Sequence, residues 1–338
     1  MREITYAQAI TEAMRDELRR DPAVFLIGED IGKHGGAFGV TKGLWDEFGS
    51  DRVRNTPICE NTIVGTALGA ALTGMRPVAE IMFADFSTLA MDQIINQAAK
   101  IRYMTGGQVK APMVVRMPQG GGGRKGTAAQ HSQTLEVLFA HIPGLKVVVP
   151  GTPYDAKGLL KAAIRDDNPV IFLEHKVLYT MKGPVPEEDY AVPLGVADVK
   201  RQGNDVTVIA TQNMMQESLK AAALLDGEGI SVEVLDPRTL KPLDEEAIVR
   251  SVKKTHRAVV VQEACSQYGT ANEWAMVIMQ HAFDWLDAAI TKVASLDVPI
   301  PFDNPEEVAV FPTAPKIAQA VRDVVRGREE AGAERVTA

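Results

Sequence analysis

The 338-residue chain lacks most features that mark membrane, secreted or metal-binding proteins. Its two cysteines, Cys59 and Cys265, are too few for a disulfide framework or a four-thiolate metal site. No apolar run reaches the length of a transmembrane helix. The N-terminus has an early acid at Glu3 and lacks the hydrophobic segment of a signal peptide. These absences predict a cytoplasmic protein that does not enter a membrane.

The chain also has fewer basic than acidic residues. The chain has 36 lysines and arginines against 44 acids, for a formal net charge of -8. A protein that binds nucleic acid by neutralising phosphates needs the opposite balance, whereas a small anion needs only a local site. The composition, 46% hydrophobic and 24% charged, is that of a globular protein, and the length predicts two domains.

Several common catalytic motifs are missing as well. The sequence has no P-loop, no G-x-G-x-x-G after its first apolar strand and no G-x-S-x-G elbow. No Cys/His cluster indicates zinc. The glycine run 120–123 is interpreted first as a flexible loop that permits close backbone approach, with phosphate binding as the alternative.

Short apolar strands alternate with helical patterns along the chain. The capping-box spacing of Thr5 and Gln8, followed by an apolar stripe at Ile10, Met14 and Leu18, predicts a first helix. The alternation that follows predicts parallel sheets covered on both faces. The predicted strands are 24–27, 78–83, 113–115, 146–149, 169–173, 206–210, 232–235, 258–261 and 293–296, and the later helices are 61–73, 86–103, 217–225, 245–252, 270–280 and 315–325.

Prolines and acids interrupt this alternation near the middle of the chain. The fold class predicted is therefore α/β, with two doubly wound domains. We place the first domain at 1–180, a linker at 181–203 and the second domain at 204–326. A charged, alanine-rich tail, expected to fray, occupies 327–338.

Two polar residues stand out within these domains. Glu60 is a lone acid between apolar residues at a predicted helix start. It is either a carboxylate favoured by the helix dipole or a desolvated carboxyl that shares a proton with a ligand nitrogen. His131 has a side chain that changes charge near neutral pH, and it is either structural or a proton donor.

Seven segments, in order along most of the chain, resemble the β subunits of thiamine-diphosphate-dependent dehydrogenases. That family acts on pyruvate, branched-chain 2-oxo acids or acetoin and is part of the transketolase superfamily. The segments are 56–60, 76–86, 129–133, 143–148, 154–159, 163–169 and 236–243.

The resemblance implies a thiamine-pyrimidine-binding domain followed by a transketolase C-terminal-like domain. It implies that Glu60 contacts N1′ of the aminopyrimidine, that Phe86 stacks on that ring and that His131 lies near the substrate and the lipoyl group. It also implies a monovalent cation, with potassium possible. The residues matching its ligands, largely backbone carbonyls, are Met113, Ala163, Ile164, Asp166 and Asn168.

The resemblance also implies partners. The superfamily anchors magnesium and the diphosphate through a Gly-Asp-Gly motif followed by asparagine, which this chain lacks. We therefore expect an α subunit to hold them in an α2β2 heterotetramer, which delivers acyl groups to a dihydrolipoyl acyltransferase core. Pyruvate is the first substrate candidate, and acetoin is the second because 84–93 and 102–108 look acetoin-like. A branched-chain 2-oxo acid is the third. The competing class is a non-catalytic α/β scaffold or electron-transfer subunit. A self-sufficient transketolase-like protein is a different enzyme class, which the absent magnesium motif disfavours.

Overall fold

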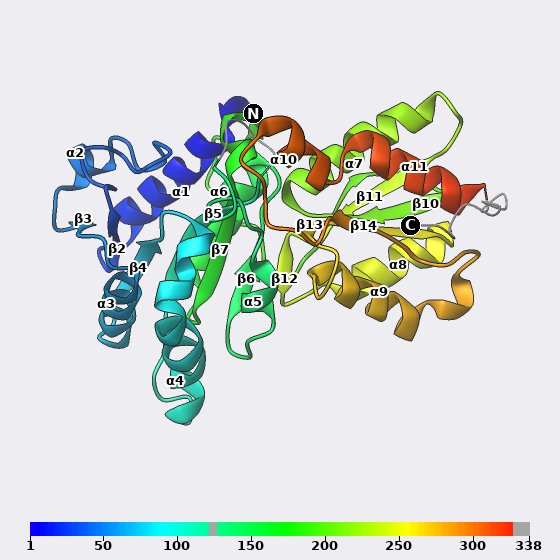
Figure 1. Ribbon diagram of the computed structural model, residues 1–338. Coiled ribbons are helices and arrows are strands. Elements are labelled where there is room, and N and C mark those ends of the chain that lie inside the picture. The colour runs from blue at the N-terminus through cyan, green and yellow to red at the C-terminus, as the bar shows by residue number, and fades with distance from the viewer. Residues whose placement is uncertain (122–126, 327–338) are drawn as a thin grey trace. The chain divides into compact units, whose positions relative to one another are not determined.

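A computed structural model describes residues 1–121 and 127–326 and divides into two compact units. The first unit comprises Met1–Val196, Arg238–Leu243 and Pro299–Ala309, and the second comprises Ala197–Pro237, Asp244–Val298 and the chain from Val310 onward. Each unit has helices packed on a mostly parallel sheet (Figure 1). The predicted boundaries 1–180, 181–203 and 204–326 stay predictions. The tail 327–338 and part of the glycine run 120–123 lie outside the described residues.

Seven strands form the main sheet of the first unit, in the order β12-β6-β7-β5-β4-β2-β3. Neighbours are parallel except for β12, which runs antiparallel to β6. A separate antiparallel pair joins β1 to β8. The strands are β1 Arg2–Thr5, β2 Val24–Glu29, β3 Val53–Thr56, β4 Arg76–Glu80, β5 Val114–Gln119, β6 Lys146–Val148, β7 Val170–His175, β8 Lys182–Val185 and β12 Thr239–Lys241.

The first helix of this unit begins with a capping box. The predicted capping box is confirmed: the Thr5 hydroxyl accepts from the Gln8 backbone N–H, and the Gln8 side chain accepts from that of Thr5. The helices are α1 Tyr6–Arg20, α2 Leu44–Phe48, α3 Glu60–Leu72, 3-10 helix η1 Ala84–Ala90, π-helix η2 Asp92–Ala98, α4 Ala99–Met104, α5 Glu136–Ala140, α6 Pro153–Arg165, 3-10 helix η3 Lys176–Thr180 and α10 Asn304–Val310.

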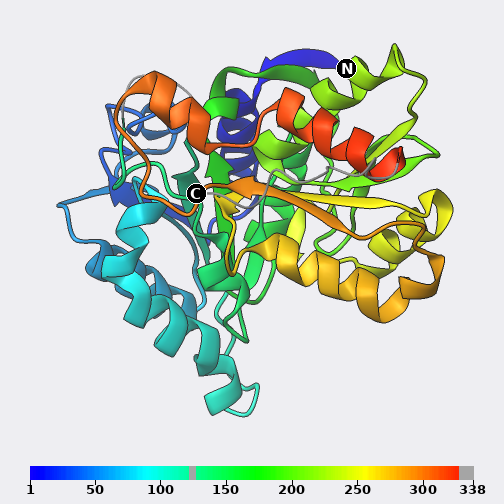
Figure 2. The same ribbon diagram turned by 45° about the vertical axis from the view of Figure 1, so that its right-hand side comes forward.

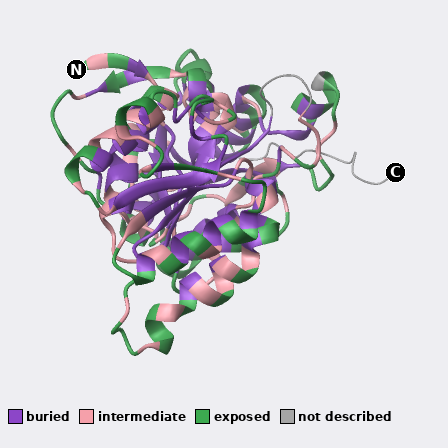
Figure 3. Ribbon diagram, turned by 90° about the vertical axis from the view of Figure 1, so that its left-hand side faces the viewer, coloured by how far each residue is buried: buried purple, intermediate pink, exposed green. Residues whose placement is uncertain are grey.

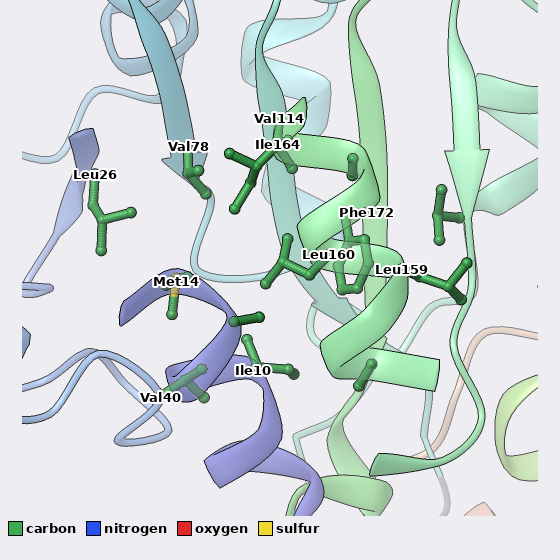
Figure 4. Packing of buried hydrophobic residues seen from close by; sticks show 14 of the residues in the cluster. Ile10, Met14, Leu26, Val40, Val78, Val114, Leu159, Leu160, Ile164 and Phe172 are labelled. Carbon is green, nitrogen blue, oxygen red and sulfur yellow. The ribbon is translucent and has the colours of Figure 1, made fainter. Parts of the chain in front are cut away.

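The apolar stripe of α1 forms one side of the first core. Ile10 and Met14 pack with Leu160 of α6 against Leu26 of β2 (Figure 4). Phe25 is equally buried but lies outside this cluster. Since alternate residues of a strand point to opposite faces, the sheet is buried on both. Its strands β2, β5 and β7 are buried along their whole length (Figure 3).

The second unit repeats this scheme with five strands in the order β14-β13-β10-β11-β9, of which only β9 is antiparallel to its neighbour. Helices α7 and α11 lie side by side over one face (Figure 2). On the other face, the Thr207 hydroxyl bonds the hydroxyls of Ser251 and Thr255 from α8. The elements are β9 Asp198–Arg201, β10 Val206–Ile209, α7 Gln212–Asp226, β11 Val232–Asp236, α8 Glu245–Thr255, β13 Ala258–Cys265, α9 Thr270–His281, 3-10 helix η4 Phe283–Trp285, β14 Thr291–Ser295 and α11 Ala314–Val325.

Two predicted elements of the first unit differ from the structure. The strand predicted at 78–83 ends at Glu80, because Phe83 joins an aromatic group beyond the sheet. The single helix predicted at 86–103 is instead a 3-10, a π and an α segment, η1, η2 and α4. Apolar periodicity does not separate these three kinds of turn, and π segments are frequent at functional sites.

Candidate functional site

The residues singled out by the sequence follow successive strands of the first sheet. Glu60 follows β3, Phe86 follows β4 and His131 follows β5. Strands β3, β2, β4 and β5 are parallel neighbours, so their carboxyl ends share one edge of the sheet. Such edges are where α/β folds bind ligands. The three residues thus belong to loops and helices of one edge.

Glu60 is the first residue of α3 and is only 6% exposed. The preceding residue, Cys59, is the N-cap of the helix, and its thiol lies 3.0 Å from the hydroxyl of Thr62 in the first turn. Helix α3 packs against η1, the segment that carries Phe86. A carboxyl in this position is both favoured by the helix dipole and largely removed from water.

A second carboxyl, which the sequence analysis missed, lies near the first. Glu29 ends β2 and is also buried. Burial raises the pKa of Glu29 above its usual value, and the negative charges of Glu60 and Asp30 raise it further. Two buried acids therefore gather at the ends of adjacent strands.

Phe86 and His131 are in direct ring contact. Their centroids are 5.1 Å apart at an interplanar angle of 81°, and both rings are half-buried. Phe83 completes the group, with its centroid 4.7 Å from His131 and 5.5 Å from Phe86. Edge-to-face contacts of this kind fix ring orientation as well as adding attraction. The site therefore has a preorganised aromatic wall in which His131 is the polar member.

The backbone on either side of His131 is held by polar contacts. The Lys176 ammonium donates to the His131 carbonyl and, at 3.3 Å, to the Thr127 hydroxyl, and it lies 5.4 Å from the Phe83 ring centroid. Gln133 donates to Asp85 through its side-chain amide at 2.8 Å. These contacts connect the segment after β5 to η3 and η1.

A buried ion cluster lies behind this edge. Arg116 of β5 donates to both carboxylate oxygens of Glu174, at 2.6 and 2.7 Å, and also to Glu80. Burial lowers the pKa of Arg116, but the two carboxylates outweigh it and raise that pKa overall. Burial, helped by the negative charge of Glu174, raises the pKa of Glu80 above its usual value even though Arg116 lowers it. Gly36, at φ +80°, adjoins this cluster, since a Cβ there would lie 3.2 Å from Glu80 Oε1.

The residues expected around a monovalent cation lie near one another but already have protein partners. Arg76 donates to the carbonyls of Ile164 and Asp166, at 2.9 and 2.5 Å. The Ala163 carbonyl accepts from the Asp166 N–H, and that of Met113 accepts from the Val170 N–H. Lys146 and the Asn168 amide pair with the Asp166 carboxylate. Each carbonyl keeps a second lone pair, so a cation there stays a prediction.

Two kinds of feature are absent from the described ranges 1–121 and 127–326. These ranges contain no group of three or more His, Cys, Asp and Glu side chains that could hold a metal ion. They also contain no helix long and apolar enough to span a membrane.

Comparison with known proteins identifies the family to which the chain belongs. Residues 2–182 match the family described as "Transketolase, pyrimidine binding domain", and residues 195–317 match "Transketolase, C-terminal domain". The chain is 49% identical over 309 residues to the β subunit of the pyruvate dehydrogenase E1 component of Bacillus subtilis (strain 168), covering 91% of this chain and 94% of that protein. The chain is a β subunit of the thiamine-diphosphate-dependent dehydrogenase family.

Other members are similarly close to this β subunit. The β subunit of acetoin:2,6-dichlorophenolindophenol oxidoreductase of B. subtilis (strain 168) is 48% identical over 336 residues, or 96% of this chain and 98% of its own. The β subunit of 2-oxoisovalerate dehydrogenase of the same organism is 46% identical over 323 residues, or 95% and 98%. A solved split-gene transketolase, titled an inactive beta4 tetramer, has a TM-score of 0.78 at 24% identity over 96% of this chain and 98% of its own, which shows the shared fold. The predicted family and fold class are thus confirmed.

Proposed function

We propose that this β subunit works in a pyruvate dehydrogenase of the two-chain type, which decarboxylates pyruvate and transfers the acyl unit to a lipoyl group. The observation that carries the proposal is Glu60, a buried carboxyl at a helix start on the same sheet edge as the Phe86–His131 pair. Catalysis by the family as a whole depends on thiamine diphosphate. In this chain, Glu60 supplies a proton-sharing acid, Phe86 an aromatic face and His131 a proton donor. These groups suit the aminopyrimidine and the reacting end of the substrate.

Each of these residues has a distinct task in the proposal. Glu60 holds a proton at N1′ of the aminopyrimidine, where its burial keeps water from competing. Phe86 orients that ring by stacking, and His131 donates a proton during acyl transfer to the lipoyl group. Thiamine diphosphate, when bound, supplies the electron sink that lets the substrate carbon–carbon bond break.

The proposal assigns the remaining groups to partners. An α subunit holds magnesium and the diphosphate in an α2β2 assembly, and a dihydrolipoyl acyltransferase core receives the acyl group. A potassium ion bound near Met113, Ala163, Ile164, Asp166 and Asn168, and a cytoplasmic location, stay predictions of the sequence.

Acetoin is a second candidate substrate, supported by the acetoin relative at 48% identity over nearly its whole length. The two candidates release different products, since pyruvate loses carbon dioxide and acetoin loses acetaldehyde. The test is to coexpress the chain with its α subunit and to assay pyruvate, acetoin and 2-oxoisovalerate with a lipoyl acceptor. Carbon dioxide from pyruvate supports the first proposal, acetaldehyde from acetoin the second, and turnover of neither refutes both.

The same preparation tests the division of the cofactor site. We expect calorimetry to detect no micromolar affinity for thiamine diphosphate in this chain alone, because it lacks the motif that anchors the diphosphate. Affinity should appear when the α subunit is added. Tight binding by the isolated chain would contradict a two-chain site.

A further inference from the structure

One hydrogen bond joins the two segments that carry Phe86 and His131. Asp85 precedes Phe86 in η1, and Gln133 lies two residues after His131. The Gln133 side-chain amide donates to Asp85 Oδ1 at 2.8 Å, and the Gln133 backbone N–H points to the same oxygen at 3.4 Å. Both the side chain and the backbone of Gln133 are thus directed to one carboxylate oxygen.

The acceptor of this bond is buried and partly unsatisfied. Asp85 is 7% exposed, and within the described residues its Oδ2 atom has no hydrogen-bond partner. A buried carboxylate is costly to the fold unless it is fully bonded, so packing alone favours an apolar residue at this position. A hydrogen bond to a charged acceptor is, however, stronger and more directional than a neutral one. Asp85 therefore suits a role in holding geometry.

The other side of Gln133 is fixed by the end of β5. The Gly120 N–H donates to the Gln133 carbonyl at 3.1 Å, and Gln119 accepts from the Leu135 N–H at 3.2 Å. Gln133 is consequently held between β5 and η1. Gln133 contacts η1 through Asp85, and the same segment carries Phe86, whose ring contacts that of His131.

We propose that Asp85 is a positioning residue that acts through Gln133 to hold His131 against Phe86. The inference rests on the proposed function, because the orientation of His131 affects the rate only if His131 donates a proton during acyl transfer. Without the bond, the segment after β5 can shift relative to η1, and His131 leaves the aromatic wall. A displacement of about 1 Å in a reacting group can lower the rate by roughly 10²-fold.

The test uses the assembled enzyme with its α subunit and four variants. Asp85→Ala removes the acceptor, and Gln133→Ala removes the side-chain donor at an exposed position, so it leaves the core intact. Asp85→Asn keeps an oxygen acceptor and should restore function. Asp92→Ala is the control, because it breaks a similar 2.8 Å amide–carboxylate bond, to Asn96, on the neighbouring η2.

We expect Asp85→Ala and Gln133→Ala to slow acyl transfer to a lipoyl substrate by about 10- to 100-fold. Thiamine diphosphate affinity should stay within about twofold of the parent enzyme, since neither residue is proposed to touch the cofactor. Deuterium exchange of the peptide that covers residues 127–136 should accelerate in both. Asp85→Asn should recover most of the rate, and Asp92→Ala should change neither rate nor exchange.

A double variant separates positioning from general stability. If Asp85 acts only through His131, adding Asp85→Ala to His131→Ala should lower the rate no further. Additive losses in the double variant would overturn the inference. Unchanged acyl transfer and unchanged deuterium exchange in Asp85→Ala and Gln133→Ala would also overturn it. In either case, an active parent enzyme would leave the proposed function standing. Unchanged acyl transfer in His131→Ala would also overturn the inference. A parent enzyme inactive on every substrate would instead refute the proposed function.

Discussion

Glu29 and Glu60 are buried carboxyl groups at one edge of the first sheet, and the negative charge of Glu60 acts on Glu29. Glu29 ends β2, and Glu60 begins the helix after β3. Burial is the largest cause of the raised pKa of Glu29, and the negative charge of Glu60 is the second. A fold that served stability alone would not place two acids together out of water, so the pair marks this sheet edge as functional.

Replacing Glu29 should stabilise the chain in a pH-dependent way. Because the pKa of Glu29 is raised in the folded state, its ionised form costs stability above the folded pKa and costs nothing below the usual value of 4.5. We expect Glu29→Gln to raise the melting temperature at pH 8 and the gain to vanish near pH 4. The exposed Glu187→Gln controls for lost net charge. A gain of the same size at both pH values would contradict the raised pKa.

Glu60→Gln should separate proton chemistry from helix stability. In the assembled enzyme, we expect exchange of the thiamine diphosphate C2 proton to slow by orders of magnitude, because an amide cannot cycle a proton with N1′. Stability should change by only about 0.3–1 kcal/mol, the usual contribution of a helix-terminal carboxylate. NMR of C2 deuteration alongside a thermal melt measures both.

Glu245→Gln is the matched control for Glu60. Glu245 is the first residue of α8 and is exposed, so it has the same helix position away from the site. It should show the same small stability change with normal C2 exchange. If Glu60→Gln behaves like this control, Glu60 serves the helix dipole alone.

His131→Ala should damage acyl transfer more than cofactor binding. A general acid contributes at least about 10²-fold, so single-turnover acylation of a lipoyl substrate should fall by roughly that factor. The affinity of this variant for thiamine diphosphate should stay close to that of the parent enzyme. His141→Ala removes an exposed histidine at the end of α5 and should leave both measurements unchanged. Normal lipoyl acylation without His131 would remove this residue from the mechanism.

Arg116→Ala should be among the most destabilising single changes in the first unit. It leaves the buried Glu80 and Glu174 carboxylates without their shared cation, a situation that costs about 3–5 kcal/mol. Arg250→Ala breaks an exposed pair with Glu246 and should cost no more than about 1 kcal/mol. Urea unfolding of both variants makes the comparison, and equal small losses would show that the cluster is not needed for stability.

Local chemistry in the sequence was enough to predict several elements. Thr5 and Gln8 predict the start of α1 because a capping box acts within one turn. The apolar strands predict buried parallel sheets because strands covered on both faces have no polar side. The short strands β1, β3, β8, β9 and β12 were not predicted, because edge strands carry weak apolar patterns.

The sequence by itself determined the α/β class, the family and the choice of Glu60, Phe86 and His131 as candidates, because these rest on local pattern and on order along the chain. Only the tertiary structure decided which distant groups meet. The pairing of Glu29 with Glu60 and the bond from Gln133 to Asp85 join residues far apart in sequence. Local periodicity cannot predict such contacts, because they depend on the order of the parallel strands in the sheet. That order is fixed by the packing of the whole sheet.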